Sequence, residues 1–489
     1  MGKQMHVLLV VTTVSLVLLV ACGGEPGPTA TQPPTPLPPL PATAVPEATA
    51  APEGETPEAT ATAVETPETP EEPVTITWWT EPIGGDERRA FEKHVIKGFN
   101  AAHPGIVLEV NVIADLDRVT RTAVQGGEGP DIIQSPGPAF MVNYVDAGHV
   151  LPLDDYAQAY GWADTIYPWA VDSGRMDGQL YSLPLTYETM VLFYNTTLFD
   201  EMGWSLPADR AELEALAQEA ASTGILAFAH GNASWQAANE WYVTIFYNNY
   251  AGSQAVYEAL TGQRRWDDPL FVEAIQLLKD YMDRGWFSGG REIYYTLLFA
   301  DIWGALGDGS AAMQMVGTWG FLQARTYFEG TDNEWDWAPL PPLRDGVPAD
   351  YALGIGSSLA INAGSANPDA TAQVLDWLYG DPQRVAQIIS DVGGGEYVIP
   401  VRVDTADFAA ETDPRLIRAI SAFSQAFESG QYGYTTWTFW PPATAEYIIE
   451  GMEQVWNGKI TPQEFCAEQQ RLFEQDMAKG NVPPIPARP

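Results

Sequence analysis

The sequence predicts an α/β protein with two mainly parallel-sheet lobes joined by a multi-segment hinge. Strand and helix patterns alternate as β-α-β-α-β over residues 74–133, which is how a mainly parallel sheet begins. Two extended segments that contain proline, residues 177–195 and 337–342, are placed where the chain would pass between sheets. The 489 residues leave ample length for two lobes once a non-globular start is set aside.

The first 21 residues have the pattern of a secretory signal peptide. Lys3 precedes an apolar run from Val7 to Val20, which is too short to cross a bilayer comfortably as a helix. The run ends in Leu-Val-Ala-Cys, which resembles a lipobox, the motif whose cysteine becomes an acylated N-terminus. We therefore expect lipidation of Cys22 and an anchor in the cell membrane on its extracytoplasmic side. The alternative is an ordinary cleaved signal peptide followed by an incidental cysteine.

Residues 22–73, which begin with this cysteine, are predicted to form a disordered linker. From Gly23 to Pro73 the chain is rich in Pro, Thr, Ala and Glu and contains no aromatic and no basic residue. Such a composition buries too little apolar surface to offset the conformational entropy lost on folding. Its position directly after the predicted anchor indicates a spacer between the membrane and the globular part.

Composition excludes several classes of partner. The net charge of −40 opposes binding to nucleic acid, because phosphate contacts require clustered Lys and Arg. Cys466 is the only other cysteine, so neither a disulfide in the mature chain nor a CxxC metal site is expected. The five histidines show no HxxxH spacing. We therefore expect no metal and no other cofactor.

The globular part begins with strands whose ends predict ligand contacts. The predicted order is a strand at Val74–Thr80, a helix over 87–102, a strand over 106–113, a helix over 117–124 and a short strand that ends at Ser135. In mainly parallel sheets, ligands bind beyond the carboxyl ends of the strands. Glu81 and Ser135 stand at two such ends and are predicted to contact the ligand.

The stretch from Asp177 to Asn195 is predicted to carry the chain out of the first lobe. A turn at Asp177-Gly178 is followed by apolar alternation and then by a β-rich run over residues 190–194. Tyr187 and Glu188, an aromatic residue and a carboxylate, stand between the two predicted strands. We therefore expect the ligand to bind here.

A predicted loop over residues 230–236 supplies two further candidates. Trp235 would offer a flat platform for a sugar ring, whose patches of C–H pack on aromatic faces, and Asn232 would offer an amide to its hydroxyls. The alternative is a tryptophan buried for packing, since large aromatic residues are usually structural.

Two aromatic segments near the end of the chain complete the candidate site. Trp319 lies between glycines at the end of a predicted strand, which is a poor place for a core residue. Residues 432–440 are rich in aromatic residues and include the candidates Trp437 and Trp440. Helices are predicted around these segments over 208–221, 267–284, 369–378, 382–390, 414–428, 446–457 and 462–479.

Several motifs resemble those of the extracellular solute-binding proteins of bacterial ABC importers, in the sugar-binding group that includes maltodextrin-binding protein. They are DGQLYSLP at 177–184, LFYNTTLFDEMG at 192–203, FNAAHPGI at 99–106, GEGPDII at 127–133, GHVLPLDDY at 148–156 and AAMQMVGTWG at 311–320. The resemblance implies the bilobed periplasmic-binding-protein fold, in which a ligand binds in a cleft between the lobes.

The resemblance also implies a function. In the maltodextrin proteins, tryptophans that correspond to Trp319 and Trp440 stack on sugar, and a carboxylate that corresponds to Glu188 binds it. The protein is therefore expected to be a monomer that captures an extracellular sugar or oligosaccharide and delivers it to ABC permease subunits without catalysis. Residues 79–85, WTEPIGG, depart from the Asp-Lys pair of the maltodextrin proteins, so maltose itself is not implied.

These expectations set the predicted domain boundaries. They are a signal peptide at 1–21, the linker at 22–73, a first lobe from 74–186 and 342–398, and a second lobe from 187–341 and 399–489. Two alternative functions stay open. The chain could bind a peptide or a polyamine, or it could be a glycoside hydrolase, since paired carboxylates in an aromatic cleft also describe those enzymes.

Overall fold

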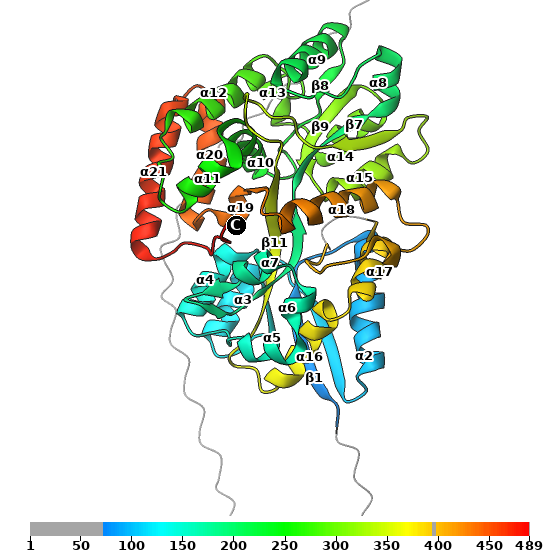
Figure 1. The fold of residues 1–489 in the computed structure, drawn as a ribbon, viewed down its shortest axis with the longest axis vertical. Helices are drawn as coiled ribbons and strands as arrows, with labels where there is room; N and C mark the ends of the chain where they lie inside the picture. Colours follow the sequence, from blue (N-terminus) through cyan, green and yellow to red (C-terminus); the bar gives the residue numbers. More distant parts are fainter. Residues whose placement is uncertain (1–71, 394–397, 489) are drawn as a thin grey trace, which may run out of the picture. The chain divides into compact units, whose positions relative to one another are not determined.

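The computed structural model describes residues 72–393 and 398–488, which form two main β-sheets with helices packed around them (Figure 1). The predicted signal peptide, Cys22 and all but the end of the predicted linker lie outside the described residues. Among the helices that are described, none combines the length and the apolar character needed to cross a membrane.

The first lobe is built on a six-stranded sheet with the order β12-β11-β3-β1-β2, in which β6 also pairs with β11. Strand β1 runs parallel to β2 and β3, which confirms the predicted β-α-β-α-β start. Strand β11 runs antiparallel to β3 and β6. The strands are β1 Val74–Thr80, β2 Ile106–Val112, β3 Ile132–Ser135, β6 Leu183–Glu188, β11 Tyr351–Ile361 and β12 Tyr432–Tyr434.

The second lobe is built on a four-stranded sheet with the order β10-β7-β9-β8. Strand β9 is parallel to β8, whereas β7 is antiparallel to both of its neighbours. The sheet therefore mixes directions, and β7 enters it straight from β6 of the other sheet through Thr189. The strands are β7 Met190–Asn195, β8 Leu226–Phe228, β9 Ala311–Gly317 and β10 Trp335–Ala338.

Helices surround both sheets (Figure 1). Those before β6, together with α16 and α17, are α1 Gly85–Ala90, α2 Gly98–Ala102, α3 Leu116–Gln125, α4 Pro138–Asp146, α5 Asp154–Tyr160, α6 Trp162–Thr165, α7 Pro168–Ser173, α16 Pro368–Tyr379 and α17 Pro382–Val392. Those between β7 and β10 are α8 Thr196–Met202, α9 Arg210–Thr223, α10 Ala238–Phe246, α11 Ser253–Leu260, α12 Pro269–Asp283, α13 Arg291–Tyr294, α14 Phe299–Gly307 and α15 Gly320–Phe328. The last four are α18 Pro414–Glu428, α19 Thr436–Phe439, α20 Pro442–Trp456 and α21 Pro462–Lys479.

Local sequence signals explain several of these boundaries. The predicted turn at Asp177-Gly178 joins β4 Arg175–Met176 to β5 Gln179–Leu180, and Asp177 has a positive φ of 51°. Helix α21 begins with a capping box in which Thr461 and Glu464 bond each other's backbone N–H groups. The helix predicted over 87–102 is a continuous helical run whose middle, Phe91–Lys97, is a π-helix.

The first two passages between the lobes occur close to where they are predicted. Thr189 alone connects β6 to β7, and residues 339–350 connect β10 to β11. The predicted lobe boundary between residues 398 and 399 implies a third passage there, but the chain is still paired with the first lobe beyond it. Residues 394–397 are not described, but Val401 still pairs with Ile166 of the first lobe.

The first lobe also takes up β12, which pairs with β11. Only after β12 does the chain add helices α20 and α21, which pack against α10 and α12 of the second lobe. Within residues 399–489, all of which are expected in the second lobe, Val401 and β12 thus pair with the first lobe. Both are pairings between segments far apart in the sequence.

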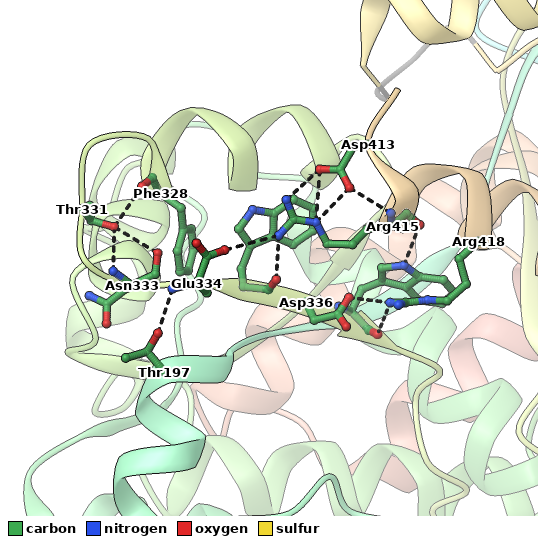
Figure 2. A network of polar contacts seen from close by, with 11 residues as sticks. Thr197, Phe328, Thr331, Asn333, Glu334, Asp336, Asp413, Arg415 and Arg418 are labelled. Atoms are coloured by element: carbon green, nitrogen blue, oxygen red, sulfur yellow. Dashed lines mark hydrogen bonds and ion pairs between the residues drawn. The ribbon is translucent and has the colours of Figure 1, made fainter. Parts of the chain in front are cut away.

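Helix α18 is fixed to the second lobe by Arg415 and Arg418, which stack on tryptophans of β10; Figure 2 shows the two arginines. The Cζ atom of Arg415 lies 3.9 Å from the centre of the Trp335 ring, and the same guanidinium donates to the Trp335 carbonyl at 2.8 Å. The Cζ atom of Arg418 lies 5.1 Å from the centre of the Trp337 ring. The carboxylate of Asp413 accepts a further bond from Arg415 at 2.7 Å. Stacking combined with hydrogen bonds makes these contacts directional.

The other end of α18 packs on the first lobe. The hydroxyls of Tyr167 and Ser424 share a hydrogen bond of 2.7 Å. The centre of the Phe427 ring lies 5.8 Å from that of Tyr187 and 5.7 Å from that of Trp169. Helix α18 is therefore a structural link between the two lobes, beside the passages made by the chain itself.

Candidate ligand site

The carboxyl ends of three strands gather at one edge of the six-stranded sheet. Strand β1 is parallel to β3, and β3 and β6 are both antiparallel to β11, so all three point the same way. Glu81 follows β1, Ser135 ends β3 and Glu188 ends β6. This is the edge at which ligands bind in open α/β sheets.

The adjoining edge of the four-stranded sheet carries Trp319. The Thr318 N–H donates to the carbonyl of Thr189 at 3.0 Å, so Trp319 lies close to the passage between the lobes. Strand β8 is parallel to β9, and its carboxyl end therefore reaches the same edge. The loop that follows β8, residues 229–237, begins at this edge as well.

Three tryptophans from separate elements meet here. The ring centre of Trp319 lies 5.1 Å from that of Trp241 on α10 and 6.2 Å from that of Trp437 on α19. Trp319 and Trp437 are partly exposed, and Trp241 is 8% exposed. Aromatic faces of this kind can pack against the apolar faces of a small ligand.

Gly317 allows the Trp319 ring to fold back over the end of β9. A Cβ atom on Gly317 would stand 2.0 Å from the Trp319 ring, which is far closer than any real contact. Any larger residue at this position would displace the ring. Gly317 is one of the two glycines that flank Trp319 in the sequence and favoured a surface tryptophan there. It makes room for the indole ring.

Glu188 is oriented by one of the tryptophans. The indole Nε1 of Trp437 donates to Glu188 Oε1 at 2.7 Å, and Glu188 is 9% exposed. A carboxylate can accept several hydrogen bonds at once, so this bond orients Glu188 without preventing it from accepting others. The bond also joins β6 of the first lobe to α19.

A chain of hydrogen bonds leads to the exposed side chain of Glu81. The indole of Trp78 donates to Gln134 Oε1 at 3.0 Å, and the amide of Gln134 donates to Glu81 Oε1 at 3.4 Å. Ser135 is buried, and its hydroxyl donates to the carbonyl of Gly137 at 3.0 Å. Glu81 is thus the exposed acceptor at this strand end, whereas the Ser135 hydroxyl is engaged within the lobe.

Glu240 of α10 is a buried carboxyl next to the tryptophan cluster. It is 6% exposed and accepts a hydrogen bond from the hydroxyl of Thr436 at 3.1 Å. Burial raises the pKa of Glu240 to about 8, and the hydrogen bond from Thr436 opposes this rise only in part. Glu240 therefore ties α10 to α19, the short helix that carries Trp437.

Sequence reasoning missed Glu240 and Trp241. Every residue of α10 is buried, so the helix has no polar face from which an inward-pointing functional residue could be distinguished. The available signal was the high content of amides and aromatic residues over 228–250. That signal directed attention to the loop before α10 instead of to the helix.

Two predicted site residues lie in the core, and their burial opposes the predicted contact with a ligand. Trp440 is 0% exposed, and its ring centre lies 4.8 Å from that of Trp266. Tyr187 is 3% exposed and packs against Tyr167 and Trp169. Burial of large aromatic surfaces stabilises the fold, so an aromatic-rich segment commonly supplies core residues as well as surface ones.

The loop after β8 places its two predicted residues differently. Trp235 is 53% exposed, so the alternative of a tryptophan buried for packing does not describe it. Asn232 is 5% exposed, and its backbone N–H donates to the carbonyl of Tyr294 at 3.1 Å. Trp235 therefore lies on the surface of the loop, and Asn232 lies beneath it.

Two surface hollows of about 490 and 520 Å³ lie away from these residues. His103, Trp377 and Arg384 contribute to the first, and Ser421 and Gln425 of α18 contribute to the second. Within the described part of the chain, no group of three or more His, Cys, Asp or Glu side chains is placed to hold a metal ion.

The chain has two α/β lobes linked by several passages, and polar and aromatic groups lie where the edges of the two sheets adjoin. These features define the class of bilobed binding proteins. The model of the family described as bacterial extracellular solute-binding protein matches residues 84–385, and the chain belongs to this family.

Individual relatives are distant. The chain is 22% identical over 317 residues to an uncharacterized ABC transporter extracellular-binding protein of Pyrococcus horikoshii, which covers 62% of this chain and 66% of the relative. It is 25% identical over 195 residues to a diacetylchitobiose binding protein of Streptomyces coelicolor, which covers 38% and 41%. The chain thus spans less than two thirds of either relative. The solved structure of a chitin oligosaccharide binding protein has a similar fold, with a TM-score of 0.69, 19% identity and coverage of 83% of this chain and 99% of that one.

Proposed function

We propose that the protein captures an extracellular carbohydrate between its lobes and delivers it to the permease of an ABC importer. The cluster of Trp241, Trp319 and Trp437, with Glu188 oriented beside it, carries this proposal. Indole faces suit the C–H patches of sugar rings, and carboxylates accept hydrogen bonds from several hydroxyls. The sugar ligands in the names of one relative and one structural neighbour support the same class of ligand.

The proposed mechanism is capture by bending of the lobes, without chemical change of the ligand. Glu188 belongs to the first lobe and Trp319 to the second, so a sugar that contacts both gains interactions only when the lobes are close. Several connections between the lobes restrict their motion to hinge bending. Small-angle scattering should therefore report a smaller radius of gyration for the protein with bound sugar than without it.

The proposed location is the extracytoplasmic face of the cell membrane, where acylated Cys22 would anchor the mature chain as a monomer. The Leu-Val-Ala-Cys motif after a short apolar run supports this proposal. Mass spectrometry of the N-terminal peptide should find lipid on Cys22, and a Cys22→Ser variant should be released from the membrane. An unmodified N-terminus at another residue would contradict the anchor but not the binding function.

Calorimetric titration of the purified protein tests the proposed ligand class. The ligands should include neutral mono- and oligosaccharides, short peptides and polyamines. We expect saturable binding of a neutral sugar, weakened by roughly one to two orders of magnitude in Trp319→Ala. Binding of a peptide or a polyamine without any sugar would refute the proposal. Hydrolysis of chromogenic glycosides by the same protein would instead favour a glycoside hydrolase.

A further inference from the structure

Helix α19, the short helix that carries Trp437, lies between strand β11 of the first lobe and helix α10 of the second (Figure 1). The hydroxyl of Thr435 donates to the carbonyl of Leu353 at 3.0 Å, and the N–H of Ile355 donates to the hydroxyl of Thr438 at 2.8 Å. These two bonds fix α19 to β11. A helix of one turn is not stable alone, so the bonds to its neighbours decide its position.

Glu240 and Thr244 of α10 hold the other side of α19 through a single residue, Thr436. The N–H of Thr436 donates to the hydroxyl of Thr244 at 3.1 Å, and its hydroxyl donates to Glu240 Oε2 at 3.1 Å. Both threonines are wholly buried, and Glu240 is 6% exposed. A buried bond that is lost leaves its partner without water to replace it, so a change at Glu240 is transmitted to Thr436.

The position of Thr436 decides that of Trp437, its neighbour in the helix. The Trp437 indole donates to Glu188 Oε1 at 2.7 Å, and its ring centre lies 6.2 Å from that of Trp319. Little space surrounds this pair, because a Cβ atom on Gly354 would stand 2.9 Å from Cγ of Glu188 and 3.1 Å from the Trp437 ring. A shift of α19 away from α10 would therefore displace the indole and break the bond that orients Glu188.

We propose that Glu240 is a positioning residue for the sugar site, because through Thr436 it holds α19, and with it Trp437 and Glu188, in place. Glu240 acts through these residues and not by contact with the sugar. The inference rests on the proposed sugar-binding function and adds a means of regulating it. Sugar affinity should depend on whether Glu240 is neutral or charged.

No charged group compensates a charge on Glu240. Burial and the bond from Thr436 set the pKa of this carboxyl at about 8, and no charged residue contributes to it. Strand β9 and helix α19, which pack on α10, contain no ionisable residue. The charged residues of the two long helices that pack on α10 are exposed or partly exposed; they are Glu446, Glu450 and Glu453 of α20 and Glu273, Lys279, Asp280 and Asp283 of α12.

The buried ionisable groups beside α10 are tyrosines. They are Tyr247, Tyr281 and Tyr294, whose hydroxyls donate to Gln469, Glu214 and Asn239. Burial raises the pKa of all three, so they stay neutral where Glu240 titrates. Glu240 is therefore the group between α10 and α19 whose charge changes near pH 8.

Ionisation of Glu240 should weaken sugar binding. A buried carboxylate without a charged partner favours an arrangement that admits water, whereas a sugar on Trp437 and Trp241 excludes water from the same region. Binding therefore favours the neutral carboxyl, and the complex holds its proton more tightly than the free protein does. Affinity is then fully present below about pH 8 and falls as pH rises through this value.

The test is a calorimetric titration of the full-length protein from pH 6 to pH 9.5, with the tightest-binding member of malto-, xylo- and chito-oligosaccharide series. Wild-type affinity should fall by roughly three- to tenfold between pH 7 and pH 9.5. Glu240→Gln, which keeps an acceptor for Thr436 but has no charge to gain, should change by less than about twofold over this range. Glu446→Gln, which removes an exposed carboxyl of α20, is the matched control and should follow the wild type.

A second pair of variants tests the connection itself. Thr436→Val removes the hydroxyl and keeps the shape of the side chain, and it should weaken sugar binding at pH 7 by roughly three- to tenfold. Thr436→Ser, which restores a hydroxyl, should recover most of the affinity. Tryptophan fluorescence at each pH verifies that every variant is folded.

The outcomes separate this inference from the function on which it rests. If sugars bind but the wild type and Glu240→Gln have the same pH profile, Glu240 supports only the fold, and the positioning role is wrong while the proposed function stands. Wild-type affinity in a folded Thr436→Val would overturn the role as well. If no sugar binds at any pH, the proposed function fails, and this inference fails with it.

Discussion

Replacing Glu240 by Gln should change how the stability of the protein depends on pH. Burial raises the pKa of this carboxyl from 4.5 to about 8, so the folded protein keeps a proton that the unfolded chain releases above pH 4.5. Between these two values the unfolded state binds fewer protons than the folded state. The free energy of unfolding therefore falls as pH rises, by about 1.4 kcal/mol per pH unit for this one group.

From pH 5 to pH 8, Glu240 alone should lower the free energy of unfolding by roughly 3 to 4 kcal/mol. Gln at this position keeps an oxygen that can accept the hydrogen bond from Thr436 and has no proton to release. Glu240→Gln should therefore be less sensitive to pH than the wild type over this range. Urea denaturation of both proteins at several pH values measures the effect, because the difference between them removes the contribution of other titrating groups.

Glu446→Gln provides the control for net charge, because it removes an exposed carboxyl of α20. Its stability should follow the pH dependence of the wild type. Equal pH dependence of the wild type and Glu240→Gln would refute the reasoning. It would mean that the pKa of Glu240 is the same in the folded and the unfolded protein. Glu240 would then not be a neutral, buried carboxyl in the folded state.

Three further substitutions test the placement of other side chains. Trp440→Ala should lower the free energy of unfolding by roughly 3 to 5 kcal/mol in urea denaturation, because it empties a packed interior, and unchanged stability would contradict the core position. Gly317→Ala should weaken sugar binding in calorimetry by displacing the Trp319 ring, whereas Gly105→Ala, where a Cβ meets nothing within 4 Å, should bind normally. Equal affinity of these two glycine variants would show that the ring position does not matter. Arg415→Lys should lower the unfolding free energy by about 0.5 to 2 kcal/mol because it loses the planar stack on β10, and no loss would mean that α18 is held by its apolar face alone.

The fold could be predicted largely because its signals are local. Alternating β-branched and aromatic residues predict a strand over Val74–Thr80, and the structure has β1 at the same bounds. The helix predicted over 462–479 also agrees with α21, which a capping box begins. The position of the third passage between the lobes could not be predicted, because it depends on the pairing of β12 with β11, about 80 residues away in the chain. The sequence around either strand contains no pattern that predicts this pairing.

The candidate site could be predicted only in part for a similar reason. Trp319 carries a local signal in Gly317, whose missing side chain makes room for the ring. Trp437 and Trp440 lie in one aromatic run, yet the first is partly exposed beside Glu188 and the second is wholly buried. Tertiary packing alone decides between them. Both tryptophans lie in the same aromatic run, so neither its composition nor the spacing of its residues distinguishes them.

The central claim is that one sugar ligand contacts both lobes where their sheet edges adjoin. A crystal structure of the protein with the tightest-binding sugar from the calorimetric series tests this claim most directly. We predict a sugar ring stacked on Trp319 or Trp437, with a ligand hydroxyl donating to Glu188. A sugar bound elsewhere, with Trp319 covered only by protein atoms, would contradict the claim.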